Sequence, residues 1–156
     1  GPVVDLVEAE GLTAGDGFVC AWVRDGSVRC WGINDSGQLG DGTLTDRARP
    51  VTIAGLGGVT QVAAGPAYAC ARRNDGTVWC WGNNYDGQLG DGTTVGRATL
   101  ARVVGLVDVA GIALGGAHSC AWRRDGVVWC WGNNESGQLG DGTTVNRLTP
   151  VLVRGL

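Results

Sequence analysis

A fifty-residue sequence repeat runs three times through this chain of 156 residues. The stretch VWCWGNNYDGQLGDGTTV at 78–95 returns as VWCWGNNESGQLGDGTTV at 128–145, and a looser VRCWGINDSGQLGDGTLT stands at 28–45. No insertion or deletion separates the copies after residue 6. A strict period of this length is typical of repeat architectures, in which each unit must fit its neighbours. The period therefore constrains the fold more than any local propensity does.

Each copy of the repeat is predicted to fold into four short strands. Alternating apolar residues and terminal glycines mark the first strand, and Asn74-Asp75-Gly76 joins the second to the third. This segment predicts a hairpin, most simply with a three-residue loop whose glycine is left-handed. The first strand is predicted at 59–64 in the second repeat and at 109–114 in the third. The second and third strands of the second repeat are predicted at 67–72 and 77–81. A weaker fourth strand is predicted at 102–104 in the second repeat and at 151–154 in the third.

Both faces of the predicted hairpin are largely apolar. With a three-residue loop, Cys20 lies opposite Cys30 and Trp22 lies opposite Val28 on one face. The other face of the second repeat carries Ala71, Trp79 and Trp81. A surface sheet would have one polar face, whereas radially stacked sheets bury both. We therefore predict an all-β fold of β-propeller blades with four antiparallel strands each. A two-layer sandwich is the alternative, but it would not need a strict register.

The repeat divides the chain into three blades, at 6–55, 56–105 and 106–156. Residues 1–5 form a lead-in, in which Gly1-Pro2 resembles the remnant of tag removal by a picornaviral-type protease. Three blades make a partial propeller, because rings usually close with four to eight blades. Unclosed terminal blades would expose apolar faces, so we predict a homo-oligomer, most simply a dimer of six blades. Three tryptophans in register are expected to fill the space between blades: Trp31, Trp81 and Trp131.

Six cysteines stand in three pairs with a ten-residue spacing: Cys20 with Cys30, Cys70 with Cys80, and Cys120 with Cys130. Directly opposed strand residues lie about 4.5 to 5.5 Å apart at Cα, which suits a disulfide. Disulfides would place the protein in an extracellular or cell-surface compartment. Reduced cysteines acting as small buried hydrophobes are the alternative. A metal site would need further ligands, and His118 is the only histidine in the chain.

Charge and hydropathy exclude two classes of partner. The formal net charge is -3 and the 12 Lys and Arg are scattered, so we expect no nucleic-acid binding. No apolar run of 18 residues exists and no signal peptide opens the sequence, so we expect no membrane partner.

Three motifs contain residue types that occur in binding or catalytic sites. Asn84, Asp86 and Asp91 offer oxygens that would suit calcium, but their spacing matches no recognised calcium loop. The segment GQLGDG is glycine-rich, yet it lacks the Lys-Ser or Lys-Thr ending of a phosphate loop and opens no helix. His118 has Phe18 and Tyr68 at its repeat position, which argues against a catalytic triad. We therefore expect no catalytic residue, cofactor or metal.

The segment AGPAYACARRNDGTVWCWGNNYDGQLGDGT at 64–93 resembles a repeat of the regulator of chromosome condensation family. The resemblance covers residues 6–156 and implies bacterial-type propeller repeats. Members of that family most often form seven-bladed propellers. They include a nucleotide exchange factor that binds chromatin, a plant ultraviolet sensor and a secreted bacterial inhibitor of β-lactamases. The chain lacks a basic tail and a GWRHT-type segment, and the fold alone does not confer function.

Positions where the copies differ are the candidate variable surface: Phe18, Asp35, Tyr68, Tyr85, Asp86, His118 and Glu135. The leading hypothesis is a non-enzymatic, self-assembling scaffold whose parent protein binds a protein partner. A secreted inhibitor-like or ligand-binding propeller, using one rim of loops, is an alternative. A repeat fragment with no partner of its own is another. An enzymatic propeller has only the fold in its favour, and an activity would have to map onto the repeated Asp41, Asp91 and Asp141 or survive their loss.

Overall fold

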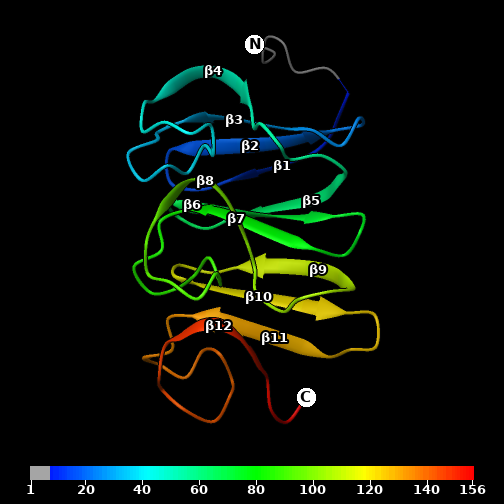
Figure 1. Ribbon diagram of the computed structural model, residues 1–156, viewed down its shortest axis with the longest axis vertical. Coiled ribbons are helices and arrows are strands. Elements are labelled where there is room, and N and C mark those ends of the chain that lie inside the picture. The colour runs from blue at the N-terminus through cyan, green and yellow to red at the C-terminus, as the bar shows by residue number, and fades with distance from the viewer. Residues whose placement is uncertain (1–7) are drawn as a thin grey trace.

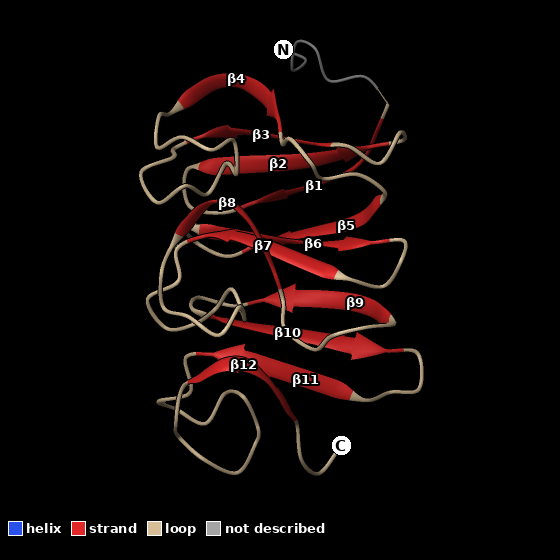
Figure 2. Ribbon diagram, viewed as in Figure 1, coloured by secondary structure: helices blue, strands red, loops and turns tan. Residues whose placement is uncertain are grey.

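The computed structural model describes residues 8–156, which form three four-stranded antiparallel sheets. The predicted lead-in at 1–5 lies outside the described residues. Strands and loops account for all of the described chain, as Figure 2 shows. The first sheet contains β1 (Ala9–Ala14), β2 (Phe18–Val23), β3 (Val28–Gly32) and β4 (Arg47–Thr52). The second contains β5 (Val59–Ala64), β6 (Tyr68–Arg73), β7 (Val78–Gly82) and β8 (Arg97–Arg102). The third contains β9 (Val109–Leu114), β10 (His118–Arg123), β11 (Val128–Gly132) and β12 (Arg147–Leu152). The all-β prediction of four antiparallel strands per blade is confirmed.

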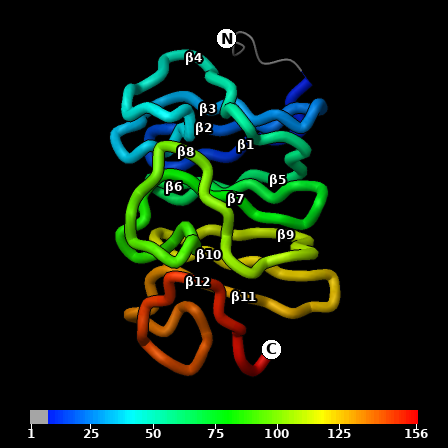
Figure 3. Tube along the Cα trace, viewed as in Figure 1, coloured from blue at the N-terminus to red at the C-terminus, as the bar shows by residue number. Residues whose placement is uncertain are grey.

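The three sheets are stacked face to face like successive blades of a propeller (Figure 1). Each sheet is built from four consecutive strands, so each lies within one of the predicted fifty-residue units. The first strands of neighbouring sheets contact one another, β1 with β5 and β5 with β9. The chain trace in Figure 3 passes once through each sheet before entering the next. The first and third sheets are not joined, so the stack is an open, partial propeller.

The hairpin between the second and third strands has the predicted geometry. Cys20 pairs with Cys30 and Trp22 pairs with Val28 in the β2–β3 register. The three-residue loop ends at Gly26, whose φ of 81° lies in the left-handed region that favours glycine. Each cysteine pair forms a disulfide, with Cα atoms 4.0 to 4.1 Å apart, slightly closer than expected from strand geometry. The disulfide prediction is confirmed in all three repeats.

The fourth strand starts earlier than the sequence suggested. We expected it near 102–104 and 151–154, but β8 covers Arg97–Arg102 and β12 covers Arg147–Leu152. The apolar signal beyond the strand comes from Val103, which is buried between sheets after β8 has ended. The true strand is harder to recognise because it is the outermost of its sheet. Such an edge tolerates proline, and β4 and β12 contain Pro50 and Pro150.

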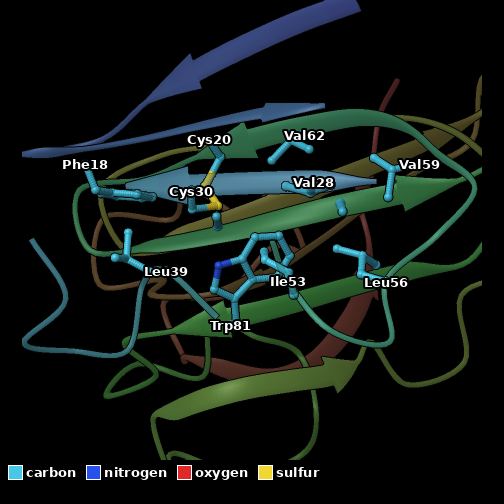
Figure 4. Close-up of a cluster of buried hydrophobic side chains, with 12 residues drawn as sticks. Phe18, Cys20, Val28, Cys30, Leu39, Ile53, Leu56, Val59, Val62 and Trp81 are labelled. Atoms are coloured by element: carbon cyan, nitrogen blue, oxygen red, sulfur yellow. A yellow bond between two sulfur atoms is a disulfide. The ribbon is translucent and has the colours of Figure 1, made fainter. Parts of the chain in front are cut away.

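The hydrophobic core lies between sheets rather than within one. One buried cluster joins the first sheet to the second, with Trp81 among Val28, Ile53 and Leu56 (Figure 4). A second cluster joins the second sheet to the third and uses the same repeat positions. Its members include Val78, Val103, Leu106 and Trp131. Stability therefore depends on contacts between neighbouring repeats, as in other repeat proteins.

Candidate interaction surfaces

The long loop after the third strand of each sheet lies along one side of the stack, which we call the loop side (Figure 1, left). A buried asparagine organises each copy of this loop. In the second sheet, Asn84 Nδ2 donates to Asp91 Oδ1 at 3.3 Å and to the carbonyls of Thr93 and Val95 at 3.0 Å each. Asn84 Oδ1 accepts from the Leu89 amide at 2.9 Å. Because a buried amide is costly when unpaired, these bonds fix the loop in one conformation.

An aspartate closes the other side of the loop. Asp91 Oδ1 accepts from the hydroxyl of Thr93 at 2.8 Å, and Asp91 Oδ2 accepts from Arg97 Nε at 2.6 Å. Burial raises the pKa of Asp91, but the bonds from Arg97 and Thr93 outweigh it and leave the pKa below its ordinary value. The pKa of Asp141 is lowered in the same way, first by Thr143. These carboxylates are ionised structural groups.

The side chains considered for calcium are occupied by protein donors. Asn84 and Asp91 are engaged as described above. Asp86 accepts hydrogen bonds from Asn133 and Asn146 of the third sheet, both at 3.1 Å. Among residues 8–156, no group of three or more His, Cys, Asp or Glu side chains is placed to hold a metal ion. Asp86 thus links two neighbouring loops.

Tyr85 lies on the loop side of the second sheet and is 83% exposed. A pocket of about 220 Å³ lies beside it, between the long loops of the first and second sheets. Its lining includes Asp35, Leu44 and Ala98. A second pocket, of about 160 Å³, lies between the second and third sheets and includes Tyr85 and Asp86. Of the predicted variable residues, Asp35, Tyr85 and Glu135 are exposed on these loops.

The other predicted surface position lies inside the molecule. Phe18 and Tyr68 are fully buried, and His118 is partly buried, so assigning Phe18 and Tyr68 to the surface was wrong. These residues begin the second strand and face the next sheet. The Tyr68 hydroxyl donates to the carbonyl of His118 at 2.6 Å, and burial raises the pKa of Tyr68. Variation between the copies at this position thus includes buried side chains, one of which, Tyr68, contacts the third sheet.

Tryptophans make the junctions between sheets, as predicted. Trp81 Nε1 donates to the carbonyl of Gln38 at 2.8 Å, and Trp131 Nε1 donates to that of Gln88 at 2.9 Å. Trp81 and Trp131 are fully buried. Trp31 occupies the same position on the first sheet and is only partly buried, since no described sheet precedes it.

Apolar residues that are buried inside the stack are exposed at its two ends. On the first sheet, Leu12 is 65% exposed, whereas its counterpart Val62 is 4% exposed. On the third sheet, Leu156 is 87% exposed, whereas Leu56 is 5% exposed. The two ends therefore present the unfilled halves of a junction that occurs twice within the chain.

Some inter-sheet contacts have no repeat signal in the sequence. Gln61 Nε2 donates to the carbonyl of Ile112 at 3.0 Å, and its Oε1 accepts from the Ile112 amide at 3.1 Å. Ser119 Oγ donates to the carbonyl of Gln88 at 2.8 Å. The first repeat has Gly11 and Val19 at these positions, so a search for recurring residues passes over them.

The stacked four-stranded sheets and their buried inter-sheet tryptophans define this chain as part of a β-propeller built from sequence repeats. The chain belongs to the Regulator of chromosome condensation (RCC1) repeat family. One model of that repeat matches residues 25–72, 75–122 and 125–156, and a second matches 11–38, 59–88 and 109–138. No match was found among curated proteins.

Solved structures share the fold. Human WBSCR16 is 25% identical with a TM-score of 0.82, and the match covers 94% of this chain and 40% of WBSCR16. Prp20p of Saccharomyces cerevisiae, whose binding to Gsp1p and histones has been characterised, is 19% identical with a TM-score of 0.82. That match covers 97% of this chain and 39% of Prp20p. The CRINKLY ectodomain of the Arabidopsis thaliana receptor kinase ACR4 is 22% identical with a TM-score of 0.53. That match covers 82% of this chain and 41% of the ectodomain chain. The chain thus spans about 40% of the length of these proteins.

Proposed function

We propose that this chain is a non-enzymatic protein-interaction module, in which copies associate through their end sheets to complete a propeller. The self-assembly part of this proposal is supported by the outer faces of the first and third sheets, each of which exposes one half of an inter-sheet junction. Large apolar side chains such as Leu12 and Leu156 are exposed there, while their counterparts inside the chain are buried. Two copies would supply six blades, which falls within the range of closed propellers.

The loop side that carries Tyr85 is proposed as the surface for a protein partner. Exposed aromatic side chains contribute strongly to protein interfaces, and the loops beneath Tyr85 are fixed by the asparagine network. The pocket of about 220 Å³ beside Tyr85 is smaller than the ~300–1,000 Å³ of a drug-sized ligand site. A protein partner therefore fits the loop side better than a small ligand does. Prp20p provides a precedent of this fold with protein partners.

An oxidising, extracellular location is proposed from the cysteines. All six described cysteines form disulfides, and such bonds persist in secreted or cell-surface proteins. The receptor-kinase ectodomain with a similar fold is a second point of support. None of residues 8–156 belongs to a helix long and apolar enough to cross a membrane.

The self-assembly part is tested by measuring solution mass by light scattering over a wide concentration range. We expect the mass of two chains of 16.0 kDa each. A single-chain mass at every concentration would contradict self-assembly.

The partner surface is tested by crosslinking partners from extracellular fluid of the source. Replacing Tyr85 by serine should abolish a specific crosslink, because the exposed aromatic anchor is lost. Replacing Val104, which is exposed and lines neither pocket that includes Tyr85, by serine is the matched control. Retention of every crosslink in the Tyr85 variant would contradict this placement of the surface.

A further inference from the structure

We infer that copies of this chain join head to tail, with Trp31 of one copy inserting against Gly140 of the next. This inference rests on the proposed self-assembly and specifies the interface. Two junctions of this kind are already present within the chain, and both use the same repeat positions. A third junction would need one half from the third sheet and the other half from the first sheet. These two halves can therefore meet only between copies of the chain.

The tryptophan contact is the first part of the junction. The indole of Trp81 lies so close to Gly40 that a Cβ there would be 2.9 Å from the ring, and Trp131 and Gly90 are related in the same way at 2.7 Å. At Gly140, a Cβ would meet only Val153, at 3.0 Å and beyond. Gln38 and Gln88, whose carbonyls accept the indole hydrogen bonds, are buried, but Gln138 is exposed. The third sheet therefore has a complete tryptophan site with no tryptophan in it.

Backbone hydrogen bonds form the second part. Gly42 N donates to the carbonyl of Ala98 at 2.9 Å, and Gly92 N donates to that of Leu148 at 3.0 Å. Continuing this register, Gly142 N would donate to the carbonyl of Ala48 in another copy. Ala48 is exposed, whereas Ala98 and Leu148, which accept these bonds inside the stack, are partly buried.

The hairpin loop provides the third part. Val59 N donates to the carbonyl of Gly26, and Val109 N donates to that of Gly76, both at 3.0 Å. Continuing the register pairs Ala9 N with the carbonyl of Gly126 in another copy. Gly26 and Gly76 are buried by this contact, whereas Gly126 is exposed.

Glu8, directly before Ala9, already has the conformation that this contact uses. Gly58 and Asp108, which precede the donor residues inside the stack, have left-handed φ values of 67° and 56°. Glu8 precedes Ala9 and has a φ of 57°, although no described sheet lies before it. A left-handed non-glycine residue is uncommon, so the first sheet is preformed for an incoming hairpin loop.

The two ends are different surfaces, which determines the symmetry. The first sheet contributes projecting groups, Trp31 and Leu12, and the third sheet contributes the recess at Gly140 and the apolar Val153 and Leu156. Each contact is therefore heterologous, and two copies close a ring through two identical contacts.

A complementation experiment tests this geometry on the full chain. In Trp31→Ala the projecting group is removed, and in Gly140→Asn the recess is blocked. Asparagine tolerates the left-handed φ of 64° at Gly140, so the loop should still fold. Gly105→Asn is the matched control, because its φ is 73° and nothing lies within 4 Å of a Cβ there. Tyr85→Ala is the control for loss of an exposed aromatic side chain.

We expect each blocked variant alone to remain a single chain in light scattering, and both controls to assemble as the unaltered protein does. An equimolar mixture of the two blocked variants should form a two-chain complex, because one intact contact remains. The protein concentration at which half of that complex has dissociated should be roughly 10²- to 10⁴-fold higher than for the closed ring, since the second contact is lost. Assembly of either blocked variant alone, or a mixture that stays single-chain, would overturn the head-to-tail contact while leaving self-assembly itself intact. A single-chain mass for the unaltered protein would instead contradict both.

Discussion

The indole nitrogen of Trp81 donates a 2.8 Å hydrogen bond to the carbonyl of Gln38, 43 residues earlier on the neighbouring sheet. The side chain is fully buried, and its ring covers Gly40. This contact satisfies a backbone acceptor at the point where two repeats meet. The recurring tryptophan thus couples packing to hydrogen bonding, which explains why another large apolar residue would not replace it fully.

Replacing Trp81 by alanine should lower the free energy of unfolding by about 3–5 kcal/mol, because a large buried side chain is lost between two sheets. Trp81→Phe should cost less but still leave the Gln38 carbonyl without its donor, at about 1–3 kcal/mol. Urea denaturation followed by circular dichroism measures both. Tyr85→Phe is the control, since its ring is exposed, and a similar loss in that variant would contradict the explanation.

Replacing Asn84 by alanine should loosen the long loop of the second sheet. The Leu89 amide and the carbonyls of Thr93 and Val95 lose their partner, at about 1–3 kcal/mol for each group that stays buried and unpaired. Hydrogen exchange read residue by residue should show faster exchange at Leu89 than in the unaltered protein. The corresponding Leu39 and Leu139 amides are internal controls and should keep their protection. Unchanged exchange at Leu89 would contradict the assigned role of Asn84.

Acid should destabilise the fold through the loop aspartates. The pKa values of Asp41, Asp91 and Asp141 lie below their ordinary value of 3.8 in the folded protein. The unfolded chain therefore binds more protons as pH falls below that value, and the stabilisation present at higher pH is lost. Urea midpoints measured from neutral pH to below 3.8 should decrease, and more gently in Asp91→Asn. An equally steep decrease in that variant would mean that other groups dominate.

Removing one disulfide should destabilise the fold only moderately. Each bridge closes a loop with a sequence separation of 10, so the chain-entropy model gives about 2–3 kcal/mol per bridge. The double variant Cys70→Ala and Cys80→Ala should therefore remain folded, with a lower urea midpoint. Thiol labelling of the freshly purified, unreduced protein should detect no free thiol, and labelling of all six cysteines would refute the bridges.

Much of the fold follows from features that recur in the sequence. The fifty-residue period, the Asp-Gly hairpin and the opposed cysteines together predict the blades, the β2–β3 register and the disulfides, because all three depend on local geometry. The fourth strand was misplaced because an edge strand has no strong alternation, while Val103 contributes an apolar signal from outside the strand.

The candidate surfaces were only partly predictable. Tyr85 was recognised because it differs from Asp35 and Glu135 at an exposed loop position. The same reasoning failed for Phe18 and Tyr68, since variation between repeats also occurs at buried positions. Gln61 and Ser119 could not be found from the repeat, because their contacts depend on how two sheets are placed in space.

The prolines in the outermost strands have a consequence for how such molecules meet. Pro50 and Pro150 lie in β4 and β12, and neither residue has a backbone N–H that could pair with a strand from another molecule. Lateral sheet extension, the usual route to fibrous aggregates, is thus disfavoured along two of the three outer edges. Copies are then expected to associate through the outer faces of the first and third sheets. Each added copy would extend the assembly around the propeller axis rather than outward from its circumference.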